Sequence, residues 1–157
     1  MCRRDLIPFI LTFAALLTGC AAVPPYRANV TDEGQGSLLR AWSSGKDLPL
    51  IYTCTEKVDG LLLFDGLHVS DTAQFTRGSL VDAGIRTLSV MATFERGLFN
   101  YTGRAELQAT LEPGHTYSLK ATVAEEDRIT LWLENDQTQE TASERKTITT
   151  SRWIKFP

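Results

Sequence analysis

The chain has 157 residues, of which 22% are charged, and its formal net charge at pH 7 is −3. A chain of this length forms one modest domain. A protein that binds the phosphates of nucleic acid needs a positively charged surface, and this chain is mildly acidic, so nucleic acid is not an expected partner.

The first 20 residues have the layout of a bacterial export signal. Arg3 and Arg4 form a basic start, residues 6–17 are almost wholly apolar, and the small Gly19 precedes Cys20. A membrane-spanning helix needs about 20 apolar residues, and this run of roughly a dozen is too short. We therefore predict that residues 1–19 are a cleaved signal peptide. An ordinary secretory signal with an incidental cysteine is the alternative.

Leu17, Thr18, Gly19 and Cys20 resemble the lipobox of bacterial lipoproteins. The resemblance implies cleavage before Cys20, a diacylglycerol thioether on its sulfur, and acylation, as with palmitate, of its new amino group. Two or more acyl chains make a stable membrane anchor, whereas one chain binds only marginally. In these lipoproteins an Asp after the cysteine marks retention in the inner membrane. Ala21 stands there instead, which implies the periplasmic face of the outer membrane.

Residues 20–47 are predicted to comprise the lipidated cysteine and a flexible tether, because Pro, Gly and Ser are frequent and apolar residues are few. Within this segment a short helical turn is expected from Ser37 to Trp42, since Leu38, Leu39 and Trp42 would then share one face. We expect Trp42 to rest on the domain rather than at the lipid surface.

From residue 48 onward, apolar and polar residues alternate, which predicts strands with one buried face. We predict about six to eight strands and no long helix, so residues 48–157 should form a small antiparallel β-sandwich, immunoglobulin-like or transthyretin-like and preceded by the tether. Each expected strand is recognised by its alternating apolar face or by a turn signal at its end. These strands are residues 48–55, 61–64, 86–94, 104–111, 116–123 and 128–133.

Turn residues separate these segments. Pro113 and Gly114 predict a tight hairpin, with His115 capping or flanking the turn and Tyr117 filling the core. Residues 125–127 form another connection, and Asp65 with Gly66 marks a further turn.

The last part of the chain is less regular. Residues 138–142 have the polar composition of an edge segment, and residues 143–146 are expected to form a loop. Residues 147–150 and 153–156 are candidates for a last strand. Trp153, Ile154 and Phe156 are expected to pack against the domain, and insertion into a partner is the alternative.

The stretch VDAGIRTLSVMATF followed by ATLEPGHTYSLKATV is similar in layout to small Gram-negative envelope lipoproteins that have no assigned activity. In those proteins a Gly-led strand precedes a hairpin with a Gly-His-x-Tyr turn. Gly114, His115 and Tyr117 match that turn here. The similarity covers roughly residues 57–135, and it implies relatedness but no reaction.

Residues that carry chemistry are few. Cys2 leaves with the signal and Cys20 is lipidated, so Cys54 has no intramolecular disulfide partner. Cys54 lies in a β-like run and is predicted to be a buried, inert thiol, with a nucleophile or an intermolecular disulfide as the alternative. With His68 and His115 far apart in sequence, we expect no metal site and no cofactor. The sequence also lacks the glycine motifs of nucleotide-binding proteins and the serine motif of α/β-hydrolases.

Adjacent acidic residues are the remaining candidates for acid–base chemistry. Glu125 and Glu126 serve a glycosidase only if they face each other across a groove. In a turn between strands such acidic residues are usually solvated, and we expect this here.

The segment from Arg96 to Gly103 resembles a hairpin loop that carries aromatic residues, so Phe99 and Tyr101, with Arg96 beside them, are the candidate binding residues. The alternative is that these aromatic side chains fold back over the end of the sandwich.

These features predict a non-enzymatic cell-envelope lipoprotein that acts as a binding, adaptor or structural module. Its partner is expected to be an envelope protein or peptidoglycan, bound through loops or an edge strand. The alternative is an envelope hydrolase or wall-modifying enzyme whose site assembles only in the fold. His68, Ser70 and Asp71 form the local polar group that would test it.

Overall fold

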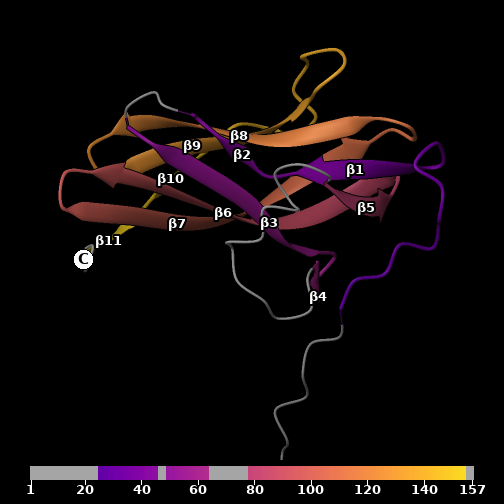
Figure 1. The fold of residues 1–157 in the computed structure, drawn as a ribbon, viewed down its shortest axis with the longest axis horizontal. Coiled ribbons are helices and arrows are strands. Elements are labelled where there is room, and N and C mark those ends of the chain that lie inside the picture. Colours follow the sequence, from indigo (N-terminus) through magenta and orange to yellow (C-terminus); the bar gives the residue numbers. More distant parts are fainter. Residues whose placement is uncertain (1–24, 46–48, 64–77, 155–157) are drawn as a thin grey trace, which may run out of the picture.

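The computed structural model describes residues 25–45, 49–63 and 78–154, which contain eleven strands and no helix. The strands form two sheets that pack as a β-sandwich (Figure 1). The predicted all-β sandwich is therefore confirmed, although the strands outnumber the six to eight expected.

The first sheet, called sheet A, has the strand order β11-β7-β6-β3-β2, with β4 paired to β3. All of its pairings are antiparallel. Its strands are β2 (Trp42–Ser43), β3 (Ile51–Val58), β4 (Leu61–Leu62), β6 (Gly84–Arg96), β7 (Phe99–Leu111) and β11 (Ser151–Ile154).

The second sheet, called sheet B, has the order β10-β9-β8-β1-β5. Its pairings are antiparallel except that β1 runs parallel to β8, so the sandwich is not purely antiparallel as predicted. Its strands are β1 (Gly36–Arg40), β5 (Ser79–Asp82), β8 (Thr116–Glu125), β9 (Arg128–Asn135) and β10 (Lys146–Thr149).

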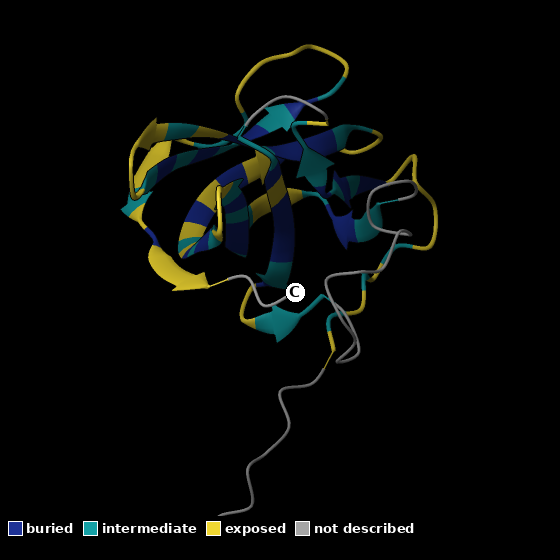
Figure 2. Cartoon of the chain, turned by 60° about the vertical axis from the view of Figure 1, so that its left-hand side comes forward, coloured by how far each residue is buried: buried dark blue, intermediate teal, exposed yellow. Residues whose placement is uncertain are grey.

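The core lies between the two sheets and contains the apolar residues that the alternation assigns to the buried faces. Each buried Leu or Phe side chain contributes about 1.5–3 kcal/mol relative to full exposure, and burial alternates along the strands (Figure 2). The fully buried members from the predicted faces are Leu88, Val90, Ala92, Phe94, Leu107, Leu119, Ile129, Leu131 and Leu133.

The segment before β3 differs from the predicted tether and helical turn. Residues 36–43 form β1 and β2, and the chain passes from sheet B to sheet A between them. Leu39 on β1 is buried in the core, so pairing with β5 and β8 outweighs the local helical spacing. Trp42 packs against the core as expected, and the Lys120 ammonium lies 5.3 Å from its ring centroid.

Asp82 at the end of β5 holds the chain that precedes β1 against the sandwich. Its carboxylate accepts hydrogen bonds from the Tyr26 hydroxyl at 3.0 Å and from the backbone and side-chain nitrogens of Asn29 at 2.7 Å each. Burial alone raises the pKa of Asp82, but these bonds and one from the Val30 N–H outweigh burial, and the pKa is lowered. Residues 25–45 thus belong to the domain and do not form the flexible tether predicted for them.

The turn at Pro113 and Gly114 forms, but the predicted hairpin is wrong. β7 lies in sheet A and β8 in sheet B, so the turn joins the two layers instead of two paired strands. Buried Tyr117 stabilises it, because its hydroxyl accepts a hydrogen bond from the Glu112 N–H at 2.8 Å. His115 flanks the turn as expected, with Nδ1 2.6 Å from the Asn135 side-chain nitrogen.

The C-terminal strands are also divided between the sheets. β10 pairs with β9 in sheet B, whereas β11 pairs with β7 in sheet A. Trp153 and Ile154 are half exposed on β11, so their predicted packing is wrong, and Phe156 lies outside the described residues. The expected edge segment 138–142 forms no strand and contributes an isolated bridge between Glu134 and Thr141.

Replacing Asp82 tests the attachment of residues 26–30. We expect Asp82→Ala to lower the free energy of unfolding by about 2–3 kcal/mol, because it removes hydrogen bonds to a charged, largely buried group. Urea unfolding of the wild type and of Glu126→Ala, which removes an exposed carboxylate, provides the comparison.

The same pair of proteins tests the pH dependence. Because the folded-state pKa of Asp82 is lowered, its ionised form stabilises the fold above its ordinary value of 3.8, and this contribution disappears as the pH falls through the lowered value. The difference between wild type and Asp82→Ala should therefore shrink below about pH 4. A difference that stays constant from neutral to strongly acid pH contradicts this account.

Candidate functional site

The predicted binding residues occupy three different environments. Tyr101 is only 4% exposed, and its ring stacks on Phe94 with centroids 4.8 Å apart, so it is a core residue and not a contact surface. Phe99 is partly buried, with the Arg152 guanidinium carbon 4.7 Å from its ring centroid. Arg96 is exposed at the end of β6. The alternative, that the aromatic residues fold inward, is correct for Tyr101.

The loop between β6 and β7 is shorter than the sequence suggests. Only Gly97 and Leu98 connect Arg96 to Phe99, which pair directly. Gly97 has a φ of 60°, as in a type II′ turn, where glycine takes the first central position. Leu98 is then the one apolar side chain at the tip of this hairpin, and it is 76% exposed.

Cys54 is buried on β3 beside Ala41 and Met91, which confirms the predicted burial of this thiol. Burial, with a smaller contribution from the Glu56 charge, raises the pKa of Cys54 to about 11 although Arg104 opposes the shift. A thiol with this pKa is almost wholly protonated at neutral pH and is a poor nucleophile.

The other chemistry-bearing residues do not converge. Glu125 and Glu126 are exposed at the turn after β8, as expected for solvated acids. His68, Ser70, Asp71 and the turn at Asp65 and Gly66 lie outside the described residues. Within residues 25–45, 49–63 and 78–154, no three His, Cys, Asp or Glu side chains are grouped as metal ligands would be.

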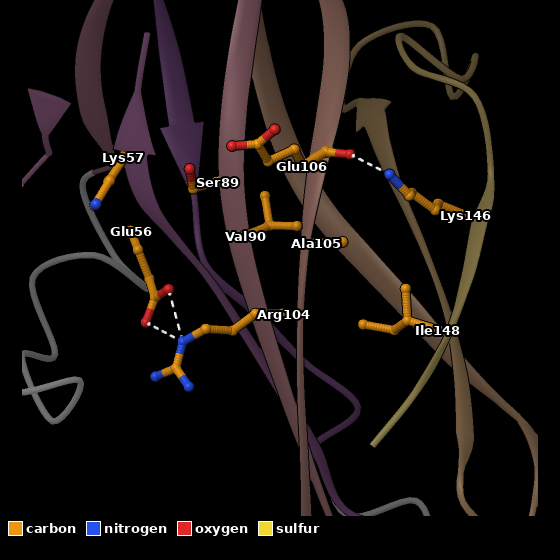
Figure 3. Close-up of a pocket in the computed structure, with 9 residues that line it drawn as sticks. All are labelled: Glu56, Lys57, Ser89, Val90, Arg104, Ala105, Glu106, Lys146 and Ile148. Atoms are coloured by element: carbon orange, nitrogen blue, oxygen red, sulfur yellow. Dashed lines mark hydrogen bonds and ion pairs between the residues drawn. The ribbon is translucent and has the colours of Figure 1, made fainter. Parts of the chain in front are cut away.

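A shallow groove of about 500 Å³ lies where β7 faces β10 (Figure 3). The Arg104 Nε lies 3.0 Å from a carboxylate oxygen of Glu56, and this pairing raises the pKa of Arg104. The Lys146 ammonium donates to the Glu106 carbonyl at 3.1 Å. The Arg104–Glu56 pair lies within sheet A, between β7 and β3, whereas the Lys146 contact connects β10 to β7 and forms a seam between the two sheets. The lining of the groove is Glu56, Lys57, Ser89, Val90, Arg104, Ala105, Glu106, Lys146 and Ile148.

The candidate site is instead the free edge of sheet A at β11. Every residue of this strand is exposed (Figure 2), with Trp153 at 50% and Ile154 at 56%. Ile154 pairs with Phe99, next to Leu98 at the hairpin tip. We call Leu98, Phe99, Arg152, Trp153 and Ile154 the edge patch.

The backbone of β11 is open on one side. In an antiparallel pair the hydrogen-bonded positions alternate, and the residues that flank a two-residue turn are bonded to each other. Because Phe99 bonds to β6, Asn100 and Thr102 direct their backbone groups toward Trp153 and Ser151. Arg152 and Ile154 therefore direct theirs away from the sheet, toward a side where no strand of the described chain lies.

Sequence reasoning found Phe99 but assigned Trp153 and Ile154 to the packed interior, with insertion into a partner only as the alternative. Trp153 and Ile154 are apolar, as in a core strand. The alternation of apolar and polar residues does not distinguish an edge strand from a central one. The available signal was Arg152 beside Trp153, since a charged residue is a common feature of edge strands.

No protein-family model matches the chain, and no curated protein or solved structure matches it either. In the part of the chain described here, no helix has the length and apolar character that crossing a membrane requires.

The reactivity of Cys54 tests its assigned environment. At pH 8 we expect iodoacetamide to modify Cys54 about a hundredfold more slowly than a small free thiol, because the pKa is raised by about two units. A chain that begins at Pro25 has Cys54 as its one cysteine, so mass spectrometry reports this site alone. Addition of urea should restore rapid modification, and rapid modification of the folded chain contradicts the assignment.

Proposed function

We propose that the protein is a cell-envelope lipoprotein, anchored through Cys20 at the periplasmic face of the outer membrane, that acts as a non-enzymatic binding module. The lipobox-like end of the signal supports the anchor. The observation that carries the binding role is the edge patch, where β11, paired on one side only, exposes Trp153 and Ile154. Natural sheets usually protect such an edge, and an edge left open pairs readily with another chain.

Strand addition is the mechanism that fits this edge. An extended segment of an envelope protein binds along β11 and forms main-chain hydrogen bonds with the outward backbone groups of Arg152 and Ile154. Ile154 contacts its side chains on one face of the sheet and Trp153 on the other, and Leu98 lies at the adjacent hairpin tip. The main chain supplies affinity, and the alternating side chains supply specificity.

The attachment of residues 26–30 to Asp82 limits how far the domain stands from the anchor. Pro25 bridges to Leu62 on β4, so only residues 21–24 separate Cys20 from the described fold. Five residue steps of fully extended chain span at most about 17 Å. The proposed anchor therefore keeps the domain close to the lipid surface, and recognition takes place there.

The anchor is tested by Cys20→Ser. We expect the wild-type chain in bacterial cells to incorporate labelled palmitate and to sediment with outer membranes, and the variant to do neither, because it lacks the sulfur that carries the diacylglycerol. Cys54→Ser serves as the control and should behave as wild type. Palmitate incorporation that survives Cys20→Ser contradicts the proposal.

Strand addition is tested by substitutions at Arg152. Proline removes one outward N–H and leaves the pairing of β11 with β7 intact, so Arg152→Pro should abolish capture of the partner. Arg152→Ala loses the same side chain but keeps the N–H, and it should retain most of the capture. The assay is photo-crosslinking in cells from an amino acid at position 98, followed by mass spectrometry.

The two variants separate backbone pairing from side-chain contact. Equal capture by Arg152→Pro and the wild type contradicts strand addition, and equal loss in both variants assigns the contact to the Arg152 side chain. Thermal unfolding of each variant verifies that β11 remains folded.

A further inference from the structure

A row of hydroxyl-bearing residues crosses the whole of sheet A. Ser43, Tyr52, Thr93, Thr102 and Ser151 lie directly opposite one another on five successive strands, from β2 to β11. Residues directly opposite in neighbouring strands project from the same face of a sheet. We call these five residues the hydroxyl row.

The hydroxyl row lies on the outer face of sheet A. Ile51 and Thr53, the neighbours of Tyr52, are buried, and the Thr53 hydroxyl donates to the Leu119 carbonyl of the opposite sheet. Tyr52 therefore points outward, and it is 37% exposed. Successive residues of a strand alternate between the two faces of the sheet. The other residues of the row are paired across the strands with Tyr52 or with one another, so they also point outward.

Trp153 joins this surface at its β11 end. Its indole Nε1–H donates to the Thr102 Oγ1 at 3.2 Å, so the ring lies over the row. The Thr102 Oγ1 is in turn 3.0 Å from the Thr93 Oγ1. The result is a pair of linked hydroxyl groups between two exposed aromatic rings, Tyr52 and Trp153.

A buried acceptor lies beside Trp153. Asn100 is directly opposite Trp153, and its side-chain oxygen has no hydrogen-bond partner within the described part of the chain. A buried acceptor without a donor costs free energy, and this oxygen would gain a donor if Trp153 moved to admit a ligand hydroxyl.

The chemistry of this surface matches an uncharged glycan. Aromatic faces pack against the C–H faces of pyranose rings, while hydroxyl and amide groups exchange hydrogen bonds with sugar hydroxyls. No charged side chain belongs to the row itself. On the same face Glu95 lies opposite Asn100, beside Thr93 and Trp153, and Arg104, farther along β7, is paired with Glu56. Neighbouring strands are about 4.8 Å apart, so the row from Tyr52 to Ser151 spans about 14 Å, which suits a short oligosaccharide.

We propose that the outer face of sheet A binds an extended, uncharged glycan across β3, β6, β7 and β11. Sugar rings stack on Tyr52 and Trp153, and sugar hydroxyls bind the linked Thr93 and Thr102 hydroxyls. The site shares Trp153 with the edge patch, but it uses side chains of the sheet face, whereas strand addition uses the backbone of β11. Either site can therefore fail without the other.

The test is calorimetric titration of the full-length chain, extracted from membranes in detergent, with oligomers of β-1,4-linked N-acetylglucosamine. We expect saturable binding, weakened about tenfold or more by Tyr52→Ala and by Trp153→Ala, and several-fold by the nearly isosteric Thr93→Val. Tyr52→Phe keeps the ring and should retain most of the affinity. Ile85→Ala, which removes another exposed apolar side chain of sheet A, is the matched control and should bind as wild type.

Three outcomes overturn the proposal. In the first, the chain binds neither the oligomers nor purified peptidoglycan sacculi. In the second, Tyr52→Ala leaves the glycan affinity unchanged. In the third, Ile85→Ala lowers the glycan affinity as much as Tyr52→Ala does. Arg152→Pro separates the two sites, because it should abolish partner capture while it leaves glycan affinity unchanged. Capture of a polypeptide that depends on Tyr52 and Thr93, without glycan binding, would assign this face to a protein and would also overturn the proposal.

Discussion

The uninterrupted pairing of β6 with β7 is the constraint on which the rest of the structure depends. Each strand has 13 residues, and their register continues from Arg96 opposite Phe99 to Gly84 opposite Leu111 without a shift. This register places Phe94 against Tyr101 in the core and Thr93 beside Thr102 on the outer face. A slip of one residue would move each of these side chains to the opposite face. The same pairing therefore specifies the core and the surface that we propose for glycan binding.

The edge patch exists because the C-terminal chain changes sheets at Thr150. Gly103 on β7 permits this change, since a Cβ there would lie 2.8 Å from the Ile148 Cδ1. The Thr150 N–H and hydroxyl both donate to the Asp127 carbonyl, which fixes the crossing point. β10 then completes one sheet while β11 forms the free edge of the other. The packing of the Ile148 side chain on Gly103 and the two hydrogen bonds of Thr150 thus accompany the crossing that leaves Trp153 and Ile154 exposed on an edge strand.

The two ends of the described chain suggest how anchor and recognition are combined. Asp82 holds the N-terminal segment on the sandwich, which leaves a short connection to Cys20. Lys146 on β10 donates a hydrogen bond to the Glu106 carbonyl on β7, and this seam joins the two sheets along that border of the sandwich. The anchor that we propose would hold the sandwich close to a membrane and give its binding surfaces a defined orientation, without the reach of a long tether.

The apolar–polar alternation and the turn residues of the sequence by themselves determined the sandwich class, the buried faces of β6 to β9, and the turn at Pro113 and Gly114. These properties are local, because alternation states which side of a strand is apolar and proline and glycine restrict backbone angles. Only the tertiary structure decided that β7 and β8 belong to different sheets, that residues 36–40 form a strand, that Tyr101 points inward, and that β11 is an edge. Strands pair through backbone groups that are the same in almost every residue, so the neighbours of a strand follow from the packing of the whole chain and not from its own sequence.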